Sequence, residues 1–186
     1  MAVLTDTRTD ELFERLSTIE GKAEIVGGRI VREMPTGEEP GLAALQIAFA
    51  LHVYARQLGR GRAVGDNVTF RVDLPKRKSF SPDAAYMAQN RSGSMSAVVG
   101  APLFAVEVRS ENDYGPAMER AIEAKIADYF AAGTRAVWDV DLLGENVVTL
   151  YLAATPGAPQ VFRRGEIANA GDVLAGWTMA VDEIFA

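Results

Sequence analysis

Three charged side chains occur between residues 81 and 133 at positions where apolar residues would be expected. Asp83 stands at the start of a short strand, Glu107 lies inside an otherwise apolar strand, and Lys125 lies on the apolar face of a helix. A buried charge without a partner is costly, so the fold must bring such groups together or leave them in water. Two carboxylates and one ammonium group around one cavity could bind a hard divalent cation and a phosphate.

Each of these residues also has a purely structural explanation. Lys125 could lay its stem over apolar surface and reach water at its tip. Glu107 could face solvent from an edge strand, and Asp83 could belong to an ordinary Ser-Pro-Asp turn. The elements that carry the three residues decide between the structural and the chemical explanation.

Periodicity places two of the three residues. Apolar and other residues alternate over 102–109, which predicts a strand with Glu107 on the face opposite Val106. Residues 116–132 predict a helix, because a proline stands near the start and a glycine follows the end. At 100° per residue, Lys125 falls within the apolar stripe of that helix.

The other elements are predicted from the same kinds of pattern. Residues 23–34 predict a hairpin around a Gly-Gly turn. A loop is indicated over 35–41, followed by a helix over 42–58 that is apolar on most sides. The segments 135–142 and 147–152 predict a further strand pair.

Composition restricts the class of protein and the kind of site. The 186 residues are 48% hydrophobic and 24% charged, without a dividing linker, which favours one globular domain over 1–186. With no cysteine and one histidine, disulfides and thiolate or multi-histidine metal sites are excluded, so any metal must be magnesium, manganese or calcium held by oxygen. There is no N-terminal secretory signal and no membrane-spanning apolar run, so the cytoplasm is the expected location.

Basic residues are concentrated in one part of an acidic chain. The net charge is −6, but residues 56–78 carry seven basic residues against Asp66 and Asp73, a local +5 that leaves −11 for the remainder. Such a strip could bind phosphate, or it could be a solvated loop. The basic turn within it makes Lys76, Arg77 and Lys78 candidate phosphate ligands.

The central block resembles a known nuclease signature. Pro82-Asp83, followed after 24 positions (107 − 83) by Glu107-Val108-Arg109, is similar to the PD-(D/E)XK motif. FAVEVRS at 104–110, KIADYFAAG at 125–133 and VWDVD at 137–141 resemble the Uma-type restriction endonuclease family of that superfamily. The similarity extends to the N-terminal hairpin and to the C-terminal segment.

This resemblance implies a restriction-endonuclease-like α/β fold, with a mixed central β-sheet flanked by helices and preceded by a hairpin. It implies an endonuclease that hydrolyses DNA phosphodiester bonds with Mg²⁺, or with Mn²⁺ in its place. Asp83, Glu107 and the Val108 carbonyl would bind the metal, and Lys125 would replace the lysine usually found in the strand. A homodimer would suit the cutting of both DNA strands.

Two departures from the family pattern leave a second interpretation open. Arg109 occupies the usual lysine position; its guanidinium cannot act as a base, but could hold a phosphate or pair with Glu107. The loop before the long helix lacks the histidine often found in relatives, and Glu38 or Glu39 could reach the metal in its place. The alternative is therefore a nuclease-fold module, weak or inactive as a catalyst, that binds nucleic acid or a protein partner.

Overall fold

The structure is a computed structural model that describes residues 7–88 and 95–185. Residues 1–6, on which the expectation of no secretory signal partly rests, lie outside the described residues, as do 89–94 and 186. None of the helices that the described residues form is both long and apolar enough to cross a bilayer.

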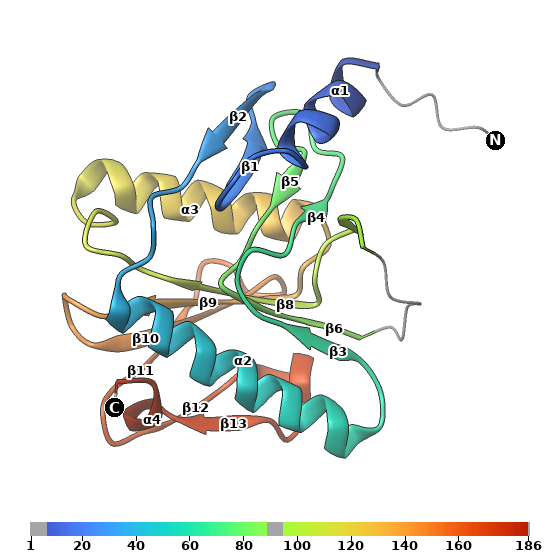
Figure 1. The fold of residues 1–186 in the computed structure, drawn as a ribbon. Helices are drawn as coiled ribbons and strands as arrows, with labels where there is room; N and C mark the ends of the chain where they lie inside the picture. The colour runs from blue at the N-terminus through green and yellow to red at the C-terminus, as the bar shows by residue number, and fades with distance from the viewer. Residues whose placement is uncertain (1–6, 89–94, 186) are drawn as a thin grey trace.

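A six-stranded mixed sheet forms the centre of the fold (Figure 1). Its strand order is β11-β10-β9-β8-β6-β3, in which β8 and β9 are parallel and the other neighbours antiparallel. The strands are β3 (Arg62–Val64), β6 (Ala84–Met87), β8 (Phe104–Val108), β9 (Ala136–Asp141), β10 (Val147–Leu152) and β11 (Gln160–Phe162). The predicted mixed central sheet and the predicted strand pair are both confirmed.

Helices cover the two faces of this sheet. The connection between the parallel strands β8 and β9 contains α3 (Pro116–Ala131), which lies on one face, whereas α2 (Glu38–Leu58) lies on the other (Figure 1). Val106 of β8 packs in the core cluster on the α2 side, and Ala105 packs in the cluster on the α3 side. Glu107 therefore lies on the α3 face, as the alternation predicts.

The start of α2 differs from the sequence prediction. The segment 35–41 was expected to be a loop, but the helix begins at Glu38 and includes Pro40 in its first turn. Proline is tolerated there because the first backbone N–H groups of a helix have no intrahelical partner. Glu38 and Glu39 are exposed and do not line the cavity described below, so the structure does not support either as a substitute for the missing histidine.

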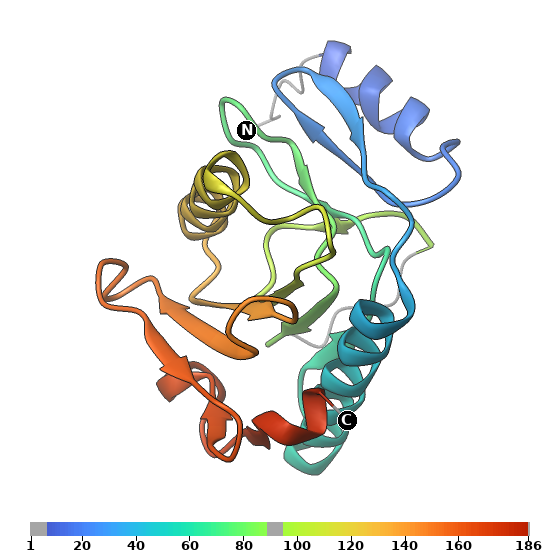
Figure 2. The same cartoon turned by 90° about the vertical axis from the view of Figure 1, so that its left-hand side faces the viewer.

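The predicted N-terminal hairpin is confirmed as β1 (Ala23–Val26) and β2 (Arg29–Arg32). Gly27 and Gly28 connect the strands with φ values of 59° and 73°, which glycine adopts without strain. Together with α1 (Thr7–Leu16), the hairpin lies at the opposite end of the molecule from the C-terminal strands (Figure 2).

The hairpin is attached to the rest of the fold through β1. The amide of Gly27 donates to the carbonyl of Lys76 at 2.6 Å, and the amide of Lys78 donates to the carbonyl of Ile25 at 2.8 Å. The Ile25 amide also donates to the buried Ser79 hydroxyl at 2.7 Å. This docking brings the hairpin close to the segment that leads into β6.

The remaining elements are short. The chain passes through two strands of a small three-stranded sheet before it reaches Asp83. A two-stranded sheet extends the core on the α2 side, where Trp177 and Met179 are buried. They are β4 (Phe70–Arg71), β5 (Ser79–Phe80), β7 (Val98–Val99), β12 (Ile167–Asn169), the 3₁₀ helix η1 (Gly171–Leu174), β13 (Thr178–Ala180) and α4 (Val181–Ile184).

Candidate active site

Asp83 lies where β6 meets the end of β8. Its backbone amide donates to the carbonyl of Val106 at 3.0 Å, and its Oδ2 accepts a hydrogen bond from the Val108 amide at 2.6 Å. These two contacts hold the Asp83 carboxylate beside Glu107. Both carboxylates line one cavity of about 380 Å³, so two of the predicted residues share a site.

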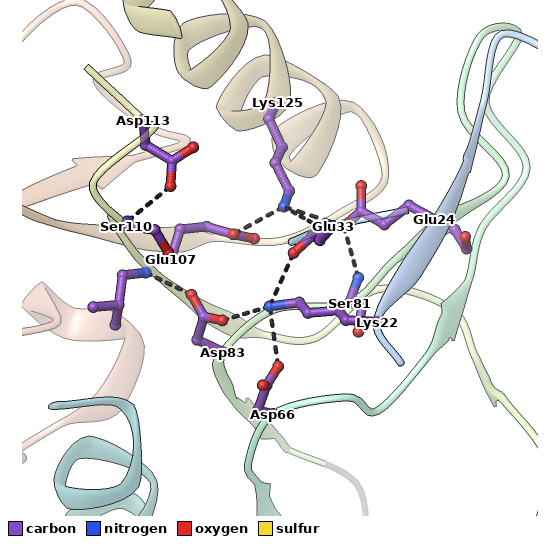
Figure 3. Close-up of polar contacts among 12 residues, drawn as sticks. Lys22, Glu24, Glu33, Asp66, Ser81, Asp83, Glu107, Ser110, Asp113 and Lys125 are labelled. Atoms are coloured by element: carbon purple, nitrogen blue, oxygen red, sulfur yellow. Dashed lines mark hydrogen bonds and ion pairs between the residues drawn. The ribbon is translucent and has the colours of Figure 1, made fainter. Parts of the chain in front are cut away.

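Lys125 and Tyr129 hold the Glu107 carboxylate from α3. The Lys125 Nζ lies 2.8 Å from Glu107 Oε2, and the Tyr129 hydroxyl donates to Oε1 at 2.6 Å. The two α3 residues are four positions apart, so they lie on one face of the helix. The buried Tyr129 ring also stacks on Phe80 with 3.9 Å between ring centroids. The structure thus brings Asp83, Glu107 and Lys125 to the same cavity (Figure 3).

The hairpin adds two carboxylates that the sequence analysis did not identify. Glu24 is 5% exposed; its Oε1 accepts from the Ser81 amide at 2.8 Å and lies 3.1 Å from the Lys125 Nζ. Glu33, just after β2, lies 3.8 Å from the same nitrogen. Glu24 interrupts the apolar strand AEIV as Glu107 interrupts FAVEV, and this signal could have marked it as a site residue.

Lys22 is a second ammonium group in this cavity, and nothing in the sequence pattern marked it. Its Nζ forms an ion pair with Asp83 Oδ1 and lies 3.0 Å from Asp66 Oδ1 and 3.3 Å from Glu33 Oε2 (Figure 3). The Lys22 side chain is 9% exposed. The same hairpin that supplies Glu24 and Glu33 therefore also supplies a cation.

The cavity holds more negative than positive charge. Six carboxylates line it, against two ammonium and two guanidinium groups, and the guanidinium of Arg77 bonds Glu24 on one side and Asp128 on the other. Burial, reinforced by Asp83, raises the pKa of Glu107 from 4.5 to about 7, and burial also raises the pKa of Glu33. Both carboxylates thus take up protons more readily than usual, because burial disfavours their charged form by more than the two lysines favour it.

The two lysines stay positively charged. Burial opposes the charged form, but Glu107, Glu24 and Glu33 raise the pKa of Lys125 well above its ordinary value. The pKa of Lys22 is likewise raised, against the effect of burial, chiefly by Asp83. A permanently protonated Lys125 cannot remove a proton from water in this state, so its chemical capacity is to stabilise negative charge.

The donor set fits a hard divalent cation. Carboxylate oxygens are the preferred ligands of Mg²⁺ and Mn²⁺, and a dication would offset the excess negative charge of the cavity. In the described part of the chain, no group of three or more carboxylate or histidine side chains is arranged to hold a metal as it stands. Asp83 and Glu107 would therefore need water ligands or side-chain movement, and the part of the Val108 carbonyl stays a prediction.

The four candidate phosphate ligands lie in different environments. Arg109 bonds Asp139 and Glu119 rather than Glu107, and Arg77 is buried between two carboxylates. Lys78 pairs with Asp73 at 2.5 Å, and Lys76 is exposed. The alternative that the basic strip is entirely a solvated loop fails for Arg77, whereas Lys76 is the candidate most accessible to a phosphate.

The raised pKa of Glu107 predicts a pH dependence of stability. Between about pH 4.5 and pH 7 the folded protein retains a proton that the unfolded chain releases, so the free energy of unfolding should fall as pH rises through this window. The variant Glu107→Gln should lack this fall in the free energy of unfolding, because its side chain does not titrate. Urea unfolding of both proteins in EDTA at pH 4, 5, 6, 7 and 8 measures the difference. If the free energy of unfolding depends on pH in the same way in both proteins, the raised pKa does not belong to Glu107.

The comparisons with known proteins agree with this fold. A crystal structure described as a "putative nuclease belonging to DUF820", from Anabaena variabilis, superposes with a TM-score of 0.71 at 16% identity and covers 94% of this chain and 97% of its own. At that identity the likeness establishes the fold alone. No curated protein sequence matches. The sequence profile of the Uma2 family, described as "Putative restriction endonuclease", matches residues 10–182, and the chain therefore belongs to the Uma2 family.

Proposed function

We propose that this protein is a metal-dependent endonuclease that hydrolyses DNA phosphodiester bonds. One observation carries the proposal: the Lys125 Nζ lies 2.8 Å from Glu107 Oε2 in a cavity that Asp83 also lines. The description of the Uma2 family and the name of the Anabaena neighbour support a nuclease in general. The choice of DNA and of Mg²⁺ or Mn²⁺ rests on the family description and on the carboxylate donors.

Each side chain of the site has a distinct role in the proposed reaction. A bound divalent cation would activate the attacking water and polarise the phosphate. Asp83 and Glu107 would hold that cation, and the Val108 amide and the Tyr129 hydroxyl orient the two carboxylates. Lys125 would stabilise the charge that develops on the phosphoryl oxygens, because its ammonium is fixed and protonated before the substrate arrives.

The alternative is a nuclease-fold module that binds nucleic acid or protein with little or no catalysis. Two observations favour it: Arg109 is hydrogen-bonded to Asp139 and Glu119, and the Lys22 ammonium bonds Asp83. Such a module would show no Mg²⁺ affinity that depends on Asp83. Binding to DNA through exposed lysines such as Lys76 would weaken steeply with salt.

The test of the proposed function is cleavage of supercoiled plasmid with Mg²⁺, with Mn²⁺ and with EDTA. Wild-type protein should nick or linearise the plasmid only with metal, and Asp83→Asn should reduce cleavage to background. Asp73→Asn makes the same chemical change at an exposed carboxylate outside the cavity, and it should cleave like wild type. Metal-independent cleavage, or equal cleavage by wild type and Asp83→Asn, would refute the proposal.

The products of the same assay bear on the proposed homodimer. Two copies related by a two-fold axis could cut both strands in one binding event and release linear plasmid directly. A monomer would release nicked circles first. A parallel reaction with an RNA duplex in place of DNA shows which of the two nucleic acids is the substrate.

A further inference from the structure

The Lys22 ammonium occupies the position in which a cation next to Asp83 is expected. It lies among three carboxylates that come from separate segments: Glu33 after β2, Asp66 between β3 and β4, and Asp83 before β6 (Figure 3). Few lysine ammonium groups are buried among several carboxylates, because the stem prefers to carry the charge to water. Here the side chain is 9% exposed and points inward.

The two oxygens of Asp83 are both engaged. Oδ2 accepts from the Val108 amide at 2.6 Å, and Oδ1 is bonded to the Lys22 Nζ. Mg²⁺ binds carboxylate oxygen at roughly 2.0–2.1 Å and brings its own water ligands. An ammonium group and a hydrated dication cannot both occupy the space in front of Oδ1, and they also repel each other.

On the basis of the proposed function, we propose that the Lys22 ammonium competes with the divalent cation for the Asp83 carboxylate. The ammonium would bind Asp83 until the metal displaces it, and this competition would set the metal affinity of the site. Glu33 and Asp66 would retain the displaced ammonium, since both already contact it. The metal-free site is then stabilised by a cation that belongs to the chain. Glu33 also lies 3.8 Å from Lys125, so it links the two lysines.

A purely structural role for Lys22 predicts a different result from competition. If the ion pair only holds the hairpin in place, replacing Lys22 should loosen the site and weaken metal binding. If Lys22 competes with the metal, replacing it with a neutral side chain should tighten metal binding. The direction of the change in Kd therefore separates the two roles.

The experiment is calorimetric titration of Mn²⁺ and Mg²⁺ into the full chain without DNA. Lys22→Met should lower the metal Kd by about tenfold or more, because a nearby positive charge is lost. Lys22→Arg keeps the charge and should leave Kd within about threefold of wild type. Arg120→Met removes a positive charge at an exposed position outside the cavity and should also leave Kd unchanged.

A second measurement uses wild-type protein, so it does not depend on the folding of a variant. Acetylation of Lys22 by an N-hydroxysuccinimide ester, followed by mass spectrometry, should be slow without metal and several-fold faster with saturating Mg²⁺. Lys78 serves as the internal reference. Metal binding without any change in Lys22 reactivity would overturn the inference.

The outcomes separate this inference from the proposed function. If Asp83→Asn abolishes metal binding but Lys22→Met binds metal no tighter than wild type, the metal site stands and the competition by Lys22 is refuted. If Asp83→Asn binds metal like wild type, or if wild type and Lys22→Met both fail to bind it, the proposed metal site is refuted together with this inference.

Discussion

Replacing Lys125 with methionine is expected to lower the rate of metal-dependent DNA cleavage by about 10²- to 10³-fold, the usual cost of removing one preorganised charge-stabilising group. The ammonium lies 2.8 Å from Glu107 and 3.1 Å from Glu24, and its pKa is raised by those carboxylates against the effect of burial. It is therefore positioned and charged before substrate binds. The measurement is the initial rate of plasmid nicking at saturating Mg²⁺, together with the metal Kd, which should not weaken.

Stability must be controlled in this comparison. Lys125→Met leaves the buried Glu24 and the partly buried Glu107 without their shared ammonium, which costs up to about 3–5 kcal/mol when no proton compensates. The Lys125 side chain is 19% exposed and Glu107 protonates readily, so a value towards the lower end is expected. Rates should be compared at a temperature where both proteins are folded by circular dichroism.

Arg120→Met provides the matched control for Lys125→Met. Arg120 is an exposed cation on the same helix, and it does not line the cavity, so its loss should change the rate by less than about twofold. If Lys125→Met cleaves as fast as wild type, Lys125 has no catalytic role. Equal losses in both variants would instead indicate a general effect of charge on DNA binding.

The meeting of Glu107 and Lys125 could be predicted from the sequence because both depend on local periodicity. The alternation in β8 fixes the face from which Glu107 projects, and the 100° step of α3 fixes the direction of Lys125. The crossover between parallel strands then places that helix on that face. Whether these residues perform the proposed chemistry is a separate question, which the cleavage assays decide.

The contributions of the hairpin could not be predicted in this way. Lys22 and Glu24 reach the cavity because β1 docks on the segment that precedes β5, through contacts such as Gly27 N to Lys76 O. Gly27 and Lys76 are about fifty positions apart in the chain, and no local period of the sequence predicts that they pair. Arg77 shows the same limit. The sequence made it a candidate phosphate ligand or part of a solvated loop, but it is 7% exposed between Glu24 and Asp128.

Arg109→Met is expected to lower the free energy of unfolding by about 3–5 kcal/mol, because it leaves a buried carboxylate without its partner. Asp139 is 3% exposed and accepts from the Arg109 Nε at 2.8 Å and from Nη2 at 2.6 Å. Glu119 accepts two more hydrogen bonds from the same guanidinium, at 2.6 and 3.1 Å. The residue at the usual lysine position of the motif thus binds two carboxylates, one on β9 and one on α3.

The measurement is urea unfolding of wild type, Arg109→Met, Arg109→Lys, Asp139→Asn and the double variant Arg109→Met/Asp139→Asn. Lysine should recover only part of the stability, because its single ammonium cannot form two bidentate pairs. The double variant should be more stable than Arg109→Met, because no unpaired carboxylate remains at position 139. A structural Arg109 must show its effect in the unfolding of the protein without DNA. If the free energy of unfolding of Arg109→Met instead lies within about 0.5 kcal/mol of wild type but the variant loses DNA affinity, Arg109 binds phosphate. Its pairing with Asp139 then adds little to stability.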